Sequence, residues 1–122
     1  MLLYLQLAVL SLICFLYVYL GMGYDYFVSL PWWDVLLHVL GGIWLGFFYY
    51  WVNALFKIRS SLVYCIFFVF AVGIGWEVFE RALHIGGSVF MSYRVDTIKD
   101  LLDDCMGGLL GAVVARNVRK KI

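Results

Sequence analysis

The sequence predicts an all-α, polytopic membrane protein that crosses the bilayer four times and forms a single domain over residues 1–122. Hydrophobic residues make up 66% of the chain and charged residues only 14%, whereas a soluble domain is about half apolar and a quarter charged. Long apolar runs recur along the chain without the turn residues and the alternation that a membrane β-barrel requires. The formal net charge of +1 argues against nucleic acid as a partner.

Each predicted span is a run long enough to cross the bilayer core, which takes about 20 apolar residues in a helix. The predicted spans cover residues 2–20, 35–56, 62–79 and 97–115, and the fourth is the shortest and least apolar. No basic residue precedes the first run and no small-residue cleavage site follows it, so we interpret it as a retained helix rather than a signal peptide. The glycine-rich stretch 86–88 indicates a loop between the third and fourth spans, roughly from Arg81 to Val95.

Basic residues predict the orientation of these spans. The second interspan loop and the C-terminal tail carry six basic residues and no acid: Lys57, Arg59, Arg116, Arg119, Lys120 and Lys121. The positive-inside rule places both segments, and therefore both termini, in the cytoplasm. The acids then all lie toward the outer ends of spans, together with both histidines: Asp25, Asp34, Glu77, Glu80, Asp96, Asp100, Asp103, Asp104, His38 and His84.

The spacing of these polar residues predicts that three spans present them to one shared pocket. Residues three or four positions apart lie on the same face of a helix. This spacing relates Asp34 to His38 in the second span, and it recurs in two further sets: Glu77, Glu80 and His84, and Asp96, Asp100 and Asp104. A carboxylate at the bilayer centre costs about 2.5–3.5 kcal/mol, so these faces should turn inward, away from lipid.

Two chemistries suit such a pocket, and a purely structural role is the alternative. The residues can bind a divalent metal, with Glu77, Glu80, His84, Asp96 and Asp100 as candidate ligands. They can instead share protons in acid–base chemistry or a proton relay. In the structural alternative, acids at the helix starts act as caps and the others pair with Arg81, Arg94 and Lys99. The sequence leaves all three open.

Small residues predict where two spans approach closely. Gly42 and Gly46 in the second span, and Gly107 and Gly111 in the fourth, are each four positions apart. This G-x-x-x-G spacing lets the backbones of membrane helices come into contact. We therefore expect it to bring the aspartates of the fourth span against a neighbouring helix.

Three motifs together resemble the VanZ-like superfamily, and most closely its YjdF-like inner-membrane branch. They are D-x-x-x-H-x-x-G-G from Asp34, G-W-E-x-x-E from Gly75, and D-x-x-x-D-L-x-x-D-x-x-G-x-x-x-G from Asp96. The resemblance implies a multi-pass protein of the bacterial inner membrane with a role in the cell envelope, where members are associated with antibiotic resistance. Its signature positions would be Asp34, His38, Glu77, Glu80, Asp96 and Asp100. The chain has Glu80 and Asp104 where the superfamily usually has Gln and Asn, which makes its site more acidic.

The leading functional hypothesis is therefore an outward-facing pocket that binds an envelope lipid, a lipid-linked molecule or a cationic ligand. A divalent metal is a candidate bridge between its carboxylates and a phosphate. The ligand-binding residues would be Asp34, His38, Glu77, Glu80, Asp96, Asp100 and Asp104.

Two alternatives remain. One is a metal-assisted lipid phosphoryl or acyl transferase with His38 or Glu77 as the base. The other is an ion- or proton-coupled transport component, which would need a homodimer because four spans are few. No G-x-S-x-G nucleophile motif occurs in the chain.

Overall fold

The computed structural model describes residues 1–23, 29–84 and 92–120, and all of its regular elements are helices. They are α1 (Leu2–Cys14), η1 (Phe15–Met22), α3 (Trp33–Leu55), α4 (Leu62–Leu83) and α5 (Tyr93–Lys120). Asp25, the glycine-rich stretch 86–88 and Lys121 lie outside these ranges.

The first predicted span is one continuous rod made of two kinds of helix. The α-helical turns of α1 pass directly into η1, a π-helix of 8 residues, which ends at Met22 and is followed by Gly23. The one buried polar side chain of α1, Gln6, donates a hydrogen bond of 3.3 Å to the carbonyl of Leu2. This bond satisfies the amide inside the helix, so the polar residue does not interrupt the span.

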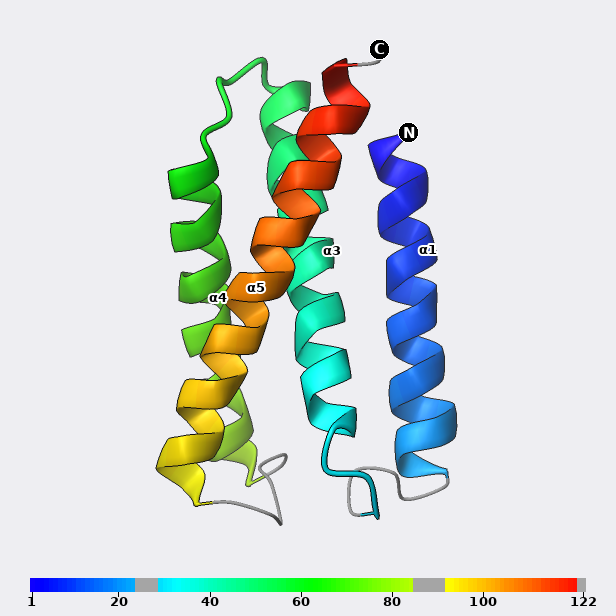
Figure 1. The fold of residues 1–122 in the computed structure, drawn as a ribbon, viewed down its shortest axis with the longest axis vertical. Coiled ribbons are helices and arrows are strands. Elements are labelled where there is room, and N and C mark those ends of the chain that lie inside the picture. The colour runs from blue at the N-terminus through cyan, green and yellow to red at the C-terminus, as the bar shows by residue number, and fades with distance from the viewer. Residues whose placement is uncertain (24–28, 85–91, 121–122) are drawn as a thin grey trace.

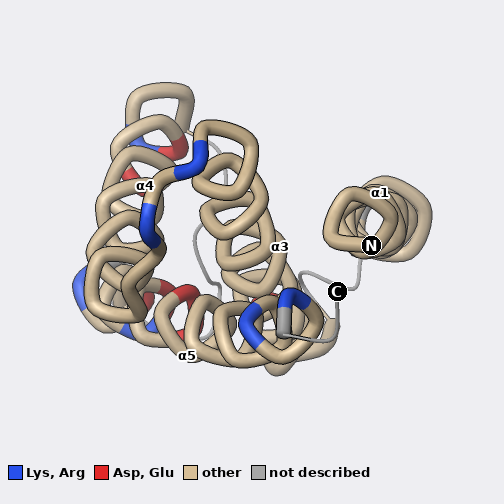
Figure 2. The backbone as a smooth tube through the Cα atoms, turned by 90° about the horizontal axis from the view of Figure 1, so that it is seen from above, with Lys and Arg blue, Asp and Glu red and all other residues tan. Residues whose placement is uncertain are grey.

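Helices α3, α4 and α5 form a three-sided bundle, and α1 packs outside it against α3 (Figure 1, Figure 2). The closest approach is between α3 and α5, where the predicted glycines meet. A Cβ atom built on Gly46 would lie 2.9 Å from the carbonyl oxygen of Gly108 and 3.0 Å from the backbone nitrogen of Ala112. Gly42 faces Asp104 and Gly108 in the same way. Close packing through small residues is thus confirmed at this crossing.

Three of the described helical stretches are long and apolar enough to cross a membrane: Leu2–Gly21, Trp33–Leu55 and Leu62–Leu83. Helix α5 has 28 residues, which is about 42 Å of helix, but its charged residues separate it from the other three in composition. The prediction of an all-helical fold is therefore confirmed, and three of the four predicted spans are among these candidates, whereas the predicted fourth span, in α5, is not.

The helix ends extend beyond the predicted spans. Helix α4 continues past Phe79 to Leu83 and is ended by His84, whose φ of 54° is left-handed. Helix α5 begins at Tyr93, so both ends of the segment predicted as a loop from Arg81 to Val95 are helical. Hydropathy marks only the apolar part of a helix, and these polar terminal turns lie outside it.

The bundle has an apolar end and a polar end. Fully buried Cys65, Val69, Ala112 and Ala115 form the core of the half that contains the start of α1 and the end of α5 (Figure 1). At this end Arg119 donates a 3.1 Å hydrogen bond to Ser60 in the α3–α4 connection. The buried acids gather in the other half of the bundle.

Candidate functional site: a buried histidine among carboxylates

His38 lies on the face of α3 that meets α5. It is four and eight positions before Gly42 and Gly46, so the same helix face carries the imidazole and the glycine crossing. Because the two backbones approach so closely at the glycines, His38 reaches the aspartates of α5 directly. Its side chain is buried, with 9% of its surface exposed.

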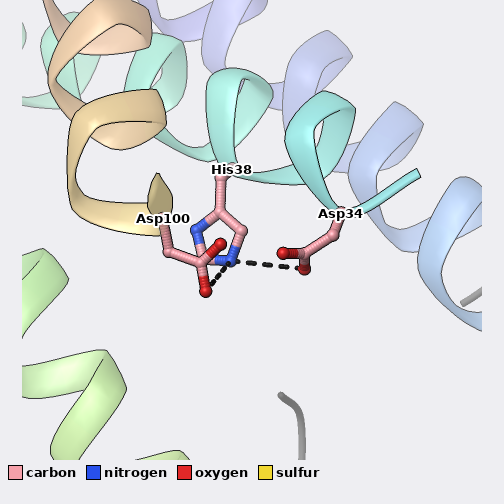
Figure 3. A group of neighbouring side chains, drawn as sticks. All are labelled: Asp34, His38 and Asp100. Carbon is pink, nitrogen blue, oxygen red and sulfur yellow. Dashed lines mark ion pairs between the residues drawn. The ribbon is translucent and has the colours of Figure 1, made fainter. Parts of the chain in front are cut away.

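The two ring nitrogens of His38 face different carboxylates. Nδ1 lies 2.8 Å from Oδ1 of Asp104, a distance at which the ring N–H donates a strong hydrogen bond. Nε2 lies 3.5 Å from Oδ1 of Asp34, one turn earlier on α3, and 3.4 Å from Oδ2 of Asp100 on α5 (Figure 3). The ring is therefore oriented by Asp104, and its other nitrogen points between two acids.

Lys99 contacts the same two carboxylates, those of Asp34 and Asp100, through their other oxygens. Its Nζ lies 3.2 Å from Oδ2 of Asp34 and 2.9 Å from Oδ1 of Asp100, and it also contacts Asp103 at 3.1 Å. Each of Asp34 and Asp100 thus presents one oxygen to the imidazole and the other to the ammonium group. This shared pairing fixes the orientation of both carboxylates.

Glu77 brings α4 into the same group. Its Oε2 accepts a 3.3 Å hydrogen bond from the hydroxyl of Thr97, and its carboxyl lies within hydrogen-bonding reach of Asp100. The other oxygen, Oε1, is buried without a hydrogen-bond partner among the described residues. Asp34 is also within such reach of Asp100. Lys99 and His38 already contact both Asp34 and Asp100, and a shared proton or a further cation would be needed to compensate Glu77 beside them.

We call this group of residues the acidic cluster. It consists of His38, Lys99 and six carboxyl groups: Asp34, Glu77, Asp96, Asp100, Asp103 and Asp104. Even with His38 protonated, carboxyl groups outnumber cations three to one. All except Asp34 and Lys99 are buried. Burying uncompensated charge is costly, so this excess calls for protons or for a bound cation.

Two of the three ligand separations around Nε2 are compatible with a tetrahedral metal ion. Metal–ligand bonds of about 2.0–2.2 Å at tetrahedral angles place the ligand atoms about 3.3–3.6 Å apart. The separations of 3.5 and 3.4 Å from Nε2 to Asp34 and Asp100 fall in this range. One ligand atom from each of these three residues lies within 4.8 Å of the others. Asp104 would then be the carboxylate that fixes a metal-bound histidine through its second nitrogen.

Three of the residues predicted from the sequence lie away from Nε2. Glu80 is half-buried and accepts a 2.8 Å hydrogen bond from the indole N–H of Trp76, one turn earlier on the same helix. His84 is exposed at the end of α4. Asp96 is buried in the first turn of α5 and acts electrostatically on Glu77. The structure thus brings together Asp34, His38, Asp100 and Asp104, with Glu77 beside them.

Comparison with known proteins shows which family the chain belongs to. The model of the family described as "Predicted membrane protein (DUF2238)" matches residues 2–121. The chain belongs to this family. Membership confirms the prediction of a membrane protein that was made from composition and apolar runs. No curated protein and no solved structure matches the chain.

The sequence of this DUF2238 protein predicts some contacts of the acidic cluster and not others. Pairing of Lys99 with an acid was part of the structural alternative, but its simultaneous contact with three aspartates from two helices was not predicted. Asp103 was not among the candidate site residues, although it is buried and pairs with Lys99. The pairing of Asp34 with His38 as metal ligands was also missed, although their four-residue spacing was the available signal.

Proposed function

We propose that this is a small bacterial inner-membrane protein whose acidic cluster holds a divalent metal ion. The metal in turn binds a phosphate-bearing envelope lipid or lipid-linked molecule. In this proposal α5 is the fourth span, both termini are cytoplasmic and the cluster opens outward. The motifs shared with the VanZ-like superfamily, and with its YjdF-like branch, support an envelope role that includes antibiotic resistance. Family membership supports the membrane location.

One observation carries the metal proposal: the two ring nitrogens of His38 contact different carboxylates. A hydrogen bond of 2.8 Å to Asp104 holds Nδ1, while Nε2 points between Asp34 and Asp100 at separations that fit tetrahedral coordination. A metal-ligating histidine almost always donates its other N–H to a carboxylate or carbonyl group. One imidazole with two carboxylates suits Zn²⁺ better than Mg²⁺ or Ca²⁺, which prefer oxygen ligands alone.

The number of protein ligands indicates what else the metal ion binds. Asp34, His38 and Asp100 supply three ligands, and a tetrahedral ion with three protein ligands keeps a fourth position for water or substrate. A phosphate oxygen fits that position because it is anionic and hard. In a membrane protein, lipid headgroups are the nearest abundant source of phosphate.

Charge placement supports the proposed orientation. The start of α1 and the end of α5 lie at the same end of the bundle, which is consistent with an even number of crossings (Figure 1). Arg119 contacts the α3–α4 connection, which carries Lys57 and Arg59, so the basic residues share that end. The positive-inside rule assigns this end to the cytoplasm and the acidic cluster to the outer half of the membrane.

The test is zinc binding to the purified full-length protein, carried on a tag without histidine. We expect about one zinc per chain, measured by elemental analysis after gel filtration. His38→Ala should abolish binding, because Nε2 is the only nitrogen ligand proposed. The matched control is His84→Ala, which removes the other histidine of the chain, an exposed one, and should retain the metal. Equal zinc content in the two variants would reject the site.

A proton- or cation-coupled transport role is the second candidate. It is favoured by the chain of neighbouring carboxyl groups from Asp34 through Asp100 to Glu77, which can exchange a proton. Transport would use a homodimer, since four spans are few for a complete pathway. Proteoliposomes with an internal pH dye distinguish the roles, because a transporter acidifies or alkalinises the lumen when a cation gradient is applied and a binding protein does not.

An enzymatic version of the proposal would use Glu77 as the base. If His38 ligates the metal through Nε2 and donates Nδ1–H to Asp104, neither nitrogen is available to take a proton. Glu77 keeps one oxygen, Oε1, without a partner among the described residues. A metal-assisted phosphoryl or acyl transfer would therefore be lost in Glu77→Gln while zinc binding persisted.

A further inference from the structure

A groove between α4 and α5 opens beside the acidic cluster. It has a volume of about 550 Å³ and is lined on the α4 side by Ile74, Val78 and Ala82, and on the α5 side by Leu101. Glu77, Arg81 and Thr97 complete the lining. Most residues that line the groove are thus apolar, and Glu77, Arg81 and Thr97 are its polar lining residues.

Glu77 joins this groove to the acidic cluster. Its Oε2 accepts the hydrogen bond from Thr97, which also lines the groove, and its carboxyl reaches Asp100. The residue is 6% exposed, and Oε1 has no hydrogen-bond partner among the described residues. A buried carboxyl oxygen without a partner beside an open groove is a place where a ligand group can bind.

The lining of the groove along α4 changes from apolar at Ile74 to basic at Arg81. Seven residues separate Ile74 from Arg81, which is about 10 Å along the helix. Arg81 is exposed in the last turn of α4, and Trp76 and Phe79 lie next to it in the chain as a tilted ring pair. Aromatic and basic residues at a helix end mark the headgroup level, so the apolar lining extends from there into the hydrocarbon.

A second apolar cavity lies farther along the same two helices. It has a volume of about 320 Å³, and Val63 and Phe67 of α4 and Leu109 of α5 are among its lining. Val63, Phe67, Ile74 and Val78 recur at intervals of four or seven residues, so the two cavities lie on one face of α4. These four side chains are all exposed in the isolated chain. Acyl chains are the natural cover for such a face in a bilayer.

We propose that a bilayer phospholipid occupies the α4–α5 groove, with an acyl chain along Ile74, Val78 and Leu101 and its phosphate beside Arg81. Charge complementarity between the guanidinium and the phosphate gives this lipid its place and its direction. The groove is then the lateral entrance through which a lipid reaches the acidic cluster. In naming the lipid this inference rests on the proposed function, but lipid binding in the groove requires no metal.

The test uses phosphatidylglycerol with a diazirine on its acyl chain, photo-crosslinked to the detergent-purified full-length protein at low lipid-to-protein ratio. Peptide mapping should place the adducts at Ile74, Val78 and Leu101. Diacylglycerol with the same chains lacks the phosphate and should label these sites about fivefold less, the effect of one basic residue near an anionic headgroup. Arg81→Gln should reduce phosphatidylglycerol labelling by a similar factor.

Arg94→Gln is the matched control, because Arg94 is an exposed arginine on α5 that does not line the groove, and its labelling should equal that of the parent. Ala82→Trp fills the groove and should abolish labelling while the protein keeps its unfolding temperature. Adducts spread evenly over exposed α1 residues such as Leu7 and Leu12, or labelling unaffected by Arg81→Gln, would overturn the proposal. If labelling persists in the presence of a chelator, and the zinc-binding test finds no specific site, the lipid groove is retained and the metal site is rejected.

Discussion

His38 has two ring nitrogens that meet chemically different demands. Nδ1 needs an acceptor because it is buried, and Asp104 supplies one at 2.8 Å. Nε2 lies between Asp34 and Asp100 at distances longer than a strong hydrogen bond. A proton on Nε2 can approach only one of these acids closely, whereas a metal ion satisfies all three groups together.

Asp104→Asn separates the charge of Asp104 from its hydrogen bond. The asparagine carbonyl can still accept from Nδ1–H, and a buried charge is removed, so the unfolding temperature should be preserved. Zinc affinity should fall about tenfold, because the carboxylate partner of a metal-bound histidine raises its basicity.

The control for this prediction is Asp103→Asn. Asp103 is equally buried but pairs with Lys99 and not with His38, so its loss should lower zinc affinity much less. Isothermal titration of both purified variants measures the difference. If the two variants have equal zinc affinity, Asp104 has no special relation to the metal.

At the scale of elements, the glycine crossing of α3 and α5 places His38 against the aspartates. A Cβ atom on Gly46 would lie 2.9 Å from a backbone carbonyl that cannot move aside easily. Gly46→Ala should therefore lower the free energy of unfolding by about 1–3 kcal/mol through overpacking. Thermal unfolding in detergent gives the change.

Gly41→Ala provides the comparison on the same helix. A Cβ atom at Gly41 meets nothing within 4 Å, so this substitution should be neutral or stabilise the helix by about 0.5–1 kcal/mol. Destabilisation of similar size in both variants would mean that the contact with α5 does not explain the effect of Gly46→Ala.

The elements were predictable from the sequence to different degrees. Apolar length located α1, α3 and α4, and the glycine spacing correctly indicated a close crossing. The π-helical turns of Phe15–Met22 carry no distinctive sequence signal, and the polar ends of α4 and α5 lie beyond the apolar runs.

For the acidic cluster, the spacing of the residues predicted which of them share a face of the same helix. The contacts of Lys99 depend on how α3 and α5 are rotated against each other, which spacing within one helix does not specify.

At the scale of the whole molecule, the proposed orientation places opposite charges on opposite sides of the membrane. Single cysteines in a background without Cys14, Cys65 and Cys105 test it on intact cells with a membrane-impermeant maleimide. A cysteine at Ser92, exposed before α5, should be labelled from outside, and one at Ile58, exposed in the α3–α4 connection, should be labelled only after lysis. The reverse pattern would indicate the opposite orientation. Labelling of both cysteines from outside would indicate that α4 does not cross the membrane completely.

The central claim is that His38, Asp34 and Asp100 ligate one metal ion, and zinc-edge X-ray absorption of the zinc-loaded protein tests it most directly. The structure leads us to expect four nitrogen or oxygen neighbours at about 2.0–2.1 Å, with the outer-shell signature of one imidazole. His38→Ala should retain no zinc and should therefore give no zinc-edge signal. A sulfur shell near 2.3 Å, which would come from a cysteine ligand, or a six-coordinate oxygen shell without imidazole, would contradict the claim.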